Sequence, residues 1–226
     1  MKTIAPFRVS VCSIEELASH CETGVSHVLS ILDPAWPVPE AFGTYSERAK
    51  LELRFHDVIE AQTGGTIVPQ PEHVADILGF GRQLMAEQGA DAHLLVHCHA
   101  GVSRSTAAVA LILAQTSPEV SANRIFEEVL RIRPQAWPNL RILEFGDAML
   151  GRRGELLAAA AGVYRAQLDR GQHLAEQMRS GGRGREIIMA LEQRSRSAPR
   201  AKPQPDRGGR KDADVPGATS KSGARK

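Results

Sequence analysis

The chain has 226 residues, of which 42% are hydrophobic, and a formal net charge of +2 at pH 7. This length and apolar content suffice for one packed domain with further segments attached. No stretch approaches the roughly 20 apolar residues of a membrane-spanning helix, and no signal peptide is recognisable, so we expect a cytoplasmic protein.

Alternating and apolar runs predict the strands of a sheet in the first hundred residues. These strands cover residues 7–11, 25–32, 51–57 and 93–96. Helices are expected over residues 15–20 and from Pro71 to residue 85, since proline suits a first helical turn. The alternation indicates an α/β fold with a central, mostly parallel sheet of about four to five strands, flanked by helices.

The segment from His97 to Ser105 lies between the last predicted strand and a strong helix former at residues 106–114. Such a loop gathers backbone N–H groups without helical partners, and these groups attract an anion together with the helix dipole. Gly101 permits a tight curve that a Cβ would hinder. We therefore expect a phosphate site formed by residues of this loop, namely His99, Ala100, Gly101, Val102, Ser103 and Arg104.

Two side chains of the loop add chemistry to this site. The N–H groups and Arg104 would favour the thiolate form of Cys98, and Arg104 can grip two phosphate oxygens with its planar fork. This pair predicts attack of sulfur on phosphorus and a phosphocysteine intermediate. Ser105 could donate a hydrogen bond to the leaving sulfur, and His97 could orient the loop.

Helices are also expected over residues 121–131, 139–145 and 154–178. We place the main domain at residues 1–152 and a C-terminal helical extension at residues 153–178.

The remaining residues, 179–226, differ in composition. They carry 13 Lys and Arg against 5 Asp and Glu, a net of +8, whereas residues 1–178 have 15 against 21, a net of −6. A segment rich in Gly, Pro, Ser, Arg and Lys buries too little apolar surface to offset the entropy of ordering. We expect a disordered basic tail that could contact nucleic acid or anionic lipid, with one apolar run at residues 187–191 able to form a helical turn or a docking patch.

The run from Cys98 to Ser105 resembles the C-x5-R-S signature of the cysteine-dependent protein tyrosine and dual-specificity phosphatases, and most closely that of compact bacterial tyrosine phosphatase-like proteins. The resemblance covers roughly residues 8–150. It implies that Cys98 is the nucleophile, that Arg104 binds phosphate, and that neither cofactor nor metal is used. It also implies that residues 1–152 are the catalytic domain of a tyrosine phosphatase acting on phosphorylated proteins.

Residues 133–139 resemble the segment of dual-specificity phosphatases in which an Arg-Pro and a Pro-Asn pair precede the last core helix. The resemblance implies that Asn139 supports the active-site loops. An ordinary helix N-cap is the alternative, because asparagine serves well in that position.

A phosphatase of this kind needs a general acid for the leaving oxygen, and a positioned acid contributes about 10²–10⁴-fold. Asp57 is the best candidate, because it ends a strand whose carboxyl end should face the same crevice as Cys98. It also matches the position of the acid in the family. The other carboxylates considered are the runner-up Asp33, Asp76 and Asp91.

Other interpretations remain open. The same loop serves RNA 5′-phosphatases and phosphoinositide phosphatases, although the latter usually carry basic residues inside it. A phosphate-binding module without turnover is a third possibility. Zinc is disfavoured, because neighbouring strand residues point to opposite faces and no CxxC or HxxxH partner exists. Cys12 or Cys21 could form a disulfide with Cys98 under oxidation, although buried free cysteines are common.

Overall fold

The computed structural model describes residues 4–20, 24–43, 49–61, 64–87, 92–171 and 173–197. Its strands form one sheet in the order β1-β4-β2-β3, and every neighbouring pair is parallel. The strands are β1 (Arg8–Cys12), β2 (His27–Leu32), β3 (Ala49–Arg54) and β4 (His93–His97). The predicted α/β fold with a parallel sheet is thus confirmed, with four strands in the described part of the chain.

The two central strands explain why the sheet forms. All residues of β2 and β4 are buried, as expected for inner strands of a parallel sheet covered on both faces. The register pairs His97 at the end of β4 with Cys12 of β1 and Ser30 of β2. The carboxyl ends of these strands therefore lie along one edge of the sheet.

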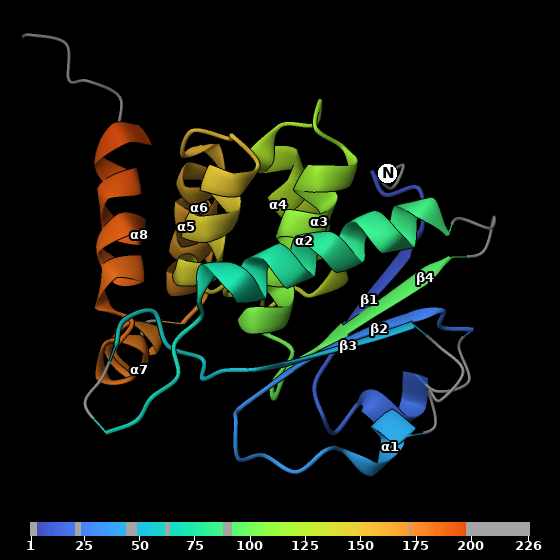
Figure 1. Cartoon of the computed structure of the whole chain (residues 1–226). Coiled ribbons are helices and arrows are strands. Elements are labelled where there is room, and N and C mark those ends of the chain that lie inside the picture. Colours follow the sequence, from blue (N-terminus) through green and yellow to red (C-terminus); the bar gives the residue numbers. More distant parts are fainter. Residues whose placement is uncertain are drawn as a thin grey trace, which may run out of the picture.

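Helices cover both faces (Figure 1). On one face lie α2 to α6, and on the other the shorter η1 and α1. Their bounds are η1 (Leu17–His20), α1 (Glu40–Gly43), α2 (Pro71–Ala86), α3 (Arg104–Thr116), α4 (Ala122–Ile132), α5 (Leu140–Met149), α6 (Glu155–Arg170), α7 (Leu174–Ser180) and α8 (Gly184–Ser197).

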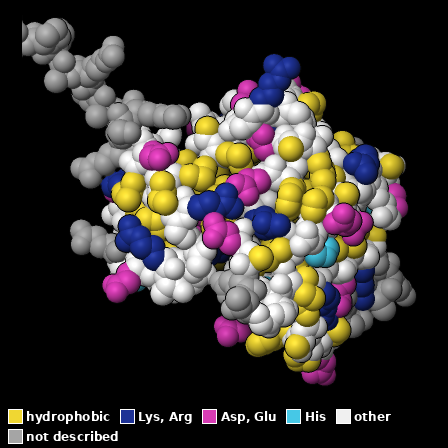
Figure 2. Space-filling model, turned by 60° about the vertical axis from the view of Figure 1, so that its left-hand side comes forward, with side chains coloured by type: hydrophobic (Ala, Val, Ile, Leu, Met, Phe, Trp, Pro, Cys, Tyr) yellow, Lys and Arg dark blue, Asp and Glu magenta, His cyan; other side chains and the backbone are white. Residues whose placement is uncertain are grey.

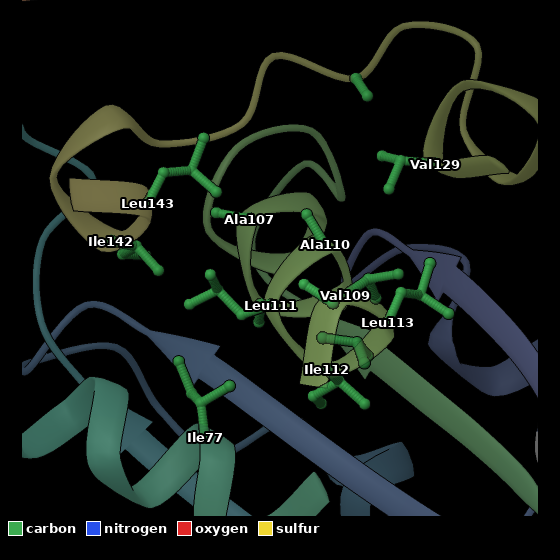
Figure 3. Packing of buried hydrophobic residues seen from close by; sticks show 14 of the residues in the cluster. Ile77, Ala107, Val109, Ala110, Leu111, Ile112, Leu113, Val129, Ile142 and Leu143 are labelled. Atoms are coloured by element: carbon green, nitrogen blue, oxygen red, sulfur yellow. The ribbon is translucent and has the colours of Figure 1, made fainter. Parts of the chain in front are cut away.

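Helix α3 lies at the centre of the core. Each of its residues from Arg104 to Ala114 is buried, as expected for a helix that is apolar on all sides. Figure 3 shows Leu111 and Ile112 of α3 among side chains of neighbouring helices, including Ile77 of α2 and Ile142 of α5. Because α3 starts directly after the phosphate loop, this packing fixes the floor of the candidate site.

The C-terminal region differs from the prediction in two ways. The single helix expected over residues 154–178 is broken at Gly171, whose extended backbone (φ −147°, ψ 98°) separates α6 from α7. Residues 184–197, expected within the disordered tail, form α8. The reason is burial, since Ile187 and Ala190 of α8 and Tyr164 of α6 join the core cluster. Residues 198–226 lie outside the described part.

The surface over α8 has mixed charge. Figure 2 brings this side of the molecule forward and shows Lys and Arg side chains interspersed with Asp and Glu and with hydrophobic groups. Arg185 of α8 pairs with Glu144 of α5 and Glu60 in this way. Among the described residues, no helix combines the length and the apolar character that crossing a membrane would require.

Candidate active site

The phosphate loop curves tightly between β4 and α3. Gly101 has a φ of +67°, in the left-handed region that favours glycine. A Cβ at this position would lie 2.6 Å from the carbonyl carbon and oxygen of Cys12, at the end of the neighbouring strand. The N–H of Ile14 donates to the His99 carbonyl at 3.0 Å and braces the loop from outside. The tight curve thus depends on glycine for both conformation and space.

Cys98 lies at the floor of this loop, 2% exposed, next to the N-terminal end of α3. Its Sγ is 3.2 Å from the Ser105 Oγ, so the Ser105 hydroxyl can donate to a thiolate in this position. Cys98 and Cys12 belong to different core clusters. Cys21 lies outside the described residues.

Arg104 is held through one end of its guanidinium. Its Nη1 donates to the Asp33 carboxylate at 2.7 Å and to the Phe55 carbonyl at 2.6 Å. Its Nε is buried and has no partner among the described residues. A buried N–H group without a partner is costly, and a bound oxyanion would satisfy it. The anchored side chain therefore presents a free donor to the loop, as a phosphate clamp requires.

Asp33, the runner-up for the acid, thus serves as an anchor for Arg104. His99 also contacts Asp33, because its Nε2 accepts from the Asp33 N–H at 3.2 Å. The His99 ring also lies 4.4 Å from that of Trp36, between centroids. Burial and the charge of Arg104 lower the pKa of His99, so the neutral ring is favoured.

Asp57 receives three hydrogen bonds on one carboxylate oxygen. Its Oδ1 accepts from the Ser103 Oγ at 2.7 Å, from the Asn139 Nδ2 at 2.9 Å and from an Nη1 of Arg183 at 3.3 Å. Its Oδ2 has no hydrogen bond to the described residues. The side chain is 31% exposed and lines the same cavity as Cys98. One oxygen is therefore fixed and the other is free to act on a ligand.

Several neighbouring groups shift the pKa of Asp57. Burial by itself would raise the pKa of this carboxyl, but the positive charges of Arg183 and Arg104 outweigh it. Hydrogen bonds from Ser103 and Asn139 act in the same direction. The pKa of Asp57 therefore lies below its ordinary value, and the carboxylate form is favoured.

Asn139 lies where both of its predicted roles are possible. Its Oδ1 accepts from the Ile142 N–H at 3.2 Å, which caps α5, while its Nδ2 donates to Asp57 and, at 3.3 Å, to the Val58 carbonyl.

The fully buried His97 precedes Cys98, and burial lowers its pKa to about 4. Its ring is therefore neutral at pH 7.

A cavity of about 470 Å³ joins these residues. One side is formed by Asp57 and by the loop residues Cys98, His99, Ala100, Val102, Ser103 and Arg104. The other side comes from residues that the sequence analysis did not place in the site, including Trp137, Gln167, Leu174, Gln177, Met178 and Arg183. A larger hollow, about 540 Å³, lies near the start of α4 and contains none of the candidate site residues.

Arg183 is the main residue that sequence reasoning missed, because it was assigned to the tail. A signal existed in the Gly181-Gly182 break followed by apolar residues at helical spacing, of which Ile187 and Ala190 are buried. Of the remaining acid candidates, Asp76 is exposed on α2 and Asp91 lies outside the described residues. No cluster of three or more His, Cys, Asp or Glu able to hold a metal occurs within the described ranges.

No protein-family model and no curated protein matches the sequence. Among solved structures, the chain is similar to human DUSP28, with a TM-score of 0.48 and 19% identity over 67% of this chain and 99% of that one. Tk-PTP in its active form gives a TM-score of 0.48 and 21% identity over 67% and 96% of the two chains. The human tyrosine phosphatase-like serine/threonine/tyrosine-interacting protein gives 0.48 and 17% over 68% and 97%. Each likeness concerns the fold alone.

Proposed function

We propose that the protein is a cysteine-dependent phosphatase that hydrolyses phosphomonoesters, with phosphotyrosine in proteins as the favoured class. One observation carries the proposal. A buried cysteine, an arginine with a free buried N–H, and a carboxylate with one free oxygen line a single cavity. These groups are the nucleophile, the phosphate clamp and the acid–base that phosphoryl transfer through cysteine needs.

In the first step the Cys98 thiolate attacks phosphorus. An S–P bond forms and the ester P–O bond breaks, while the leaving oxygen takes a proton from the Asp57 carboxyl group. The loop N–H groups and Arg104 stabilise the charge on the three equatorial oxygens of the transferred group. Among the described residues, Asp57 is the only carboxylate that lines the cavity, whereas Asp33 lies outside it and is engaged by Arg104.

In the second step the Asp57 carboxylate removes a proton from water, and the water oxygen attacks the phosphocysteine. The S–P bond breaks and inorganic phosphate leaves. The electron pair returns to the Cys98 sulfur, where the Ser105 hydroxyl, 3.2 Å away, can donate to it. The lowered pKa of Asp57 favours this base role, and the charge of a bound phosphate dianion would favour the protonated form in the first step.

The walls of the cavity bear on the substrate class. Val102, Trp137, Leu174 and Met178 provide apolar surface beside the loop, which suits an aryl group better than the short side chain of phosphoserine. The loop positions 99, 100, 102 and 103 hold no Lys or Arg, which disfavours a multiply phosphorylated inositol headgroup. We therefore favour phosphotyrosine over phosphoserine and phosphoinositides.

The direct test is turnover of p-nitrophenyl phosphate by the wild type, Cys98→Ser and Cys12→Ser. We expect turnover by the wild type, and a loss on the order of 10⁶-fold in Cys98→Ser, as for other enzymes deprived of their nucleophile. Cys12→Ser is the matched control, since Cys12 is equally buried but lies outside the cavity, and it should retain activity. A folded wild type that binds phosphopeptides without hydrolysing them would instead support a binding module.

A further inference from the structure

We propose that the C-terminal arm, residues 174–197, contributes Arg183 to the active site, where Arg183 is a positioning residue that holds Asp57 and Ser103 for proton transfer. This inference rests on the proposed role of Asp57. It also moves the boundary of the functional unit, because the sequence predicts the end of the catalytic domain at residue 152.

Arg183 reaches the site across a long stretch of sequence. Its Nη1 donates to the Ser103 Oγ at 2.7 Å and to the Asp57 Oδ1 at 3.3 Å. The residue is only 6% exposed, and it lines the cavity that holds Cys98. A single guanidinium nitrogen thus bridges the phosphate loop and the candidate acid.

The other edge of the same guanidinium is fixed by Glu186. Nε and Nη2 of Arg183 donate to the two carboxylate oxygens of Glu186 at 2.8 and 2.6 Å. Glu186 is fully buried and also accepts from the Trp137 Nε1 at 2.6 Å and from the Leu140 N–H at 3.0 Å. Buried charges are retained only where partners compensate their desolvation. One edge of the Arg183 guanidinium is therefore held by Glu186, and the remaining nitrogen contacts Ser103 and Asp57 in the site.

Arginine suits this place in a way that lysine does not. A planar fork can make a bidentate bond on one side while a third nitrogen reaches further partners, whereas an ammonium group is a single point. Trp137 and Leu140 flank Asn139, the other donor to Asp57 outside the loop. The same carboxylate that locks Arg183 therefore also braces the segment that presents Asn139.

The backbone delivers Arg183 to this position. Gly182 has a φ of +74°, and the Arg183 N–H donates to the Met178 carbonyl at 2.8 Å, which closes the end of α7. Helix α8 starts at Gly184 and docks through the fully buried Ile187 and Ala190. Figure 1 shows α7 and α8 on the side of the molecule where the strands end. The position of Arg183 is thus built into the packing of the arm.

The charge of Arg183 predicts a direction for the pH dependence. The charged or titratable groups that interact electrostatically with Asp57 are Arg104 of α3, His99 of the loop, Tyr164 of α6 and Arg183. Glu186 acts on Arg183, with which it is paired. The Arg183 cation stabilises the Asp57 carboxylate and lowers its pKa. Removing this cation should raise the pKa, so the loss of activity caused by ionisation of the acid should occur at higher pH.

The test compares Arg183→Gln with Arg185→Gln on two substrates. Arg185 is the matched control, since it lies two residues along the chain and pairs with Glu144 and Glu60 outside the cavity. Phenyl phosphate needs a proton on its leaving oxygen far more than p-nitrophenyl phosphate does. We expect Arg183→Gln to lower kcat on phenyl phosphate by at least about tenfold more than it lowers kcat on p-nitrophenyl phosphate. We also expect the basic limb of its pH profile to move to higher pH. Arg185→Gln should match the wild type.

Arg183→Lys keeps the charge but not the fork, and should show the same split between substrates with a smaller shift of the basic limb. It also provides the test if Arg183→Gln does not fold. A folded variant that loses activity equally on both substrates, or loses none, with the basic limb unmoved, would overturn the inference. A wild type without phosphatase activity would instead overturn the proposed function.

Discussion

The phosphate loop, residues 98–105, and the C-terminal arm line the same cavity but are specified in different ways. In the loop, the key contact joins Cys98 to Ser105, seven residues apart, and the curve depends on Gly101. In the arm, Arg183 contacts Ser103 and Asp57, which lie 80 and 126 residues away in the sequence. A local segment thus supplies the proposed nucleophile, while distant packing supplies the surroundings of the proposed acid.

The groups that would react with the substrate and the groups that position them come from different parts of the molecule. The loop holds the groups that would touch phosphorus, and its geometry follows from a strand end, a glycine and a helix start. Asp57 touches both regions, since its Oδ1 accepts from Ser103 of the loop and from Arg183 of the arm. Changes at Asp57 should therefore produce the largest effects after loss of the nucleophile itself.

Asp57→Asn should lower kcat on phenyl phosphate by about 10²–10⁴-fold, the range for a positioned general acid. The amide keeps the size of the side chain but cannot donate the carboxyl proton. In the wild type, kcat/KM should fall as pH rises through the lowered pKa of Asp57 in the free enzyme, because the acid form is depleted. This limb should be absent in the variant. Retention of both the limb and the rate would exclude Asp57 as the acid.

Asp33→Asn tests the carboxylate that directly follows β2, whereas Asp57 lies three residues beyond the end of β3 at Arg54, and it should have a smaller effect than Asp57→Asn. A neutral amide oxygen can still accept from Arg104, but more weakly than the carboxylate at 2.7 Å. We expect kcat/KM to fall about fivefold to tenfold, because a less firmly held Arg104 binds the transferred phosphoryl group less well. Steady-state kinetics of both variants would distinguish the residue that anchors Arg104 from the general acid. If Asp33→Asn instead lowered kcat as much as expected for Asp57→Asn, the assignments would be reversed.

Gly101→Ala should break the loop while leaving the arm in place. An alanine at φ +67° is strained, and its Cβ would lie 2.6 Å from backbone atoms of Cys12. The control is Gly151→Ala, which has nearly the same φ, +65°, with no atom within 4 Å of the new Cβ. We expect the free energy of unfolding to fall by about 1–2 kcal/mol in the control and by about 2–5 kcal/mol in Gly101→Ala. Equal losses in denaturant titrations would show that the close approach to Cys12 has no energetic weight.

The sheet and the position of the phosphate loop could be predicted from the sequence, whereas the C-terminal arm could not. Apolar runs such as residues 93–96 indicate a buried strand, and Gly101 and Arg104 follow it in the pattern expected for a phosphate loop. The role of Asp33 as the anchor of Arg104 depends on how neighbouring strand ends meet, which no local pattern encodes. Residues 184–197 are mostly polar and charged, so their composition predicts disorder despite the few apolar positions. Only the packed structure shows that Ile187 and Ala190 are buried.

The most direct test of the central claim is to trap the phosphorylated protein. The wild type would be mixed with an aryl phosphate, quenched within the first turnover and digested for mass spectrometry. The account predicts one phosphoryl group on the peptide that contains Cys98, attached through sulfur, and none on that peptide in Cys98→Ser. Turnover by the wild type with no phosphoryl group on Cys98, or with the group on another residue, would contradict it.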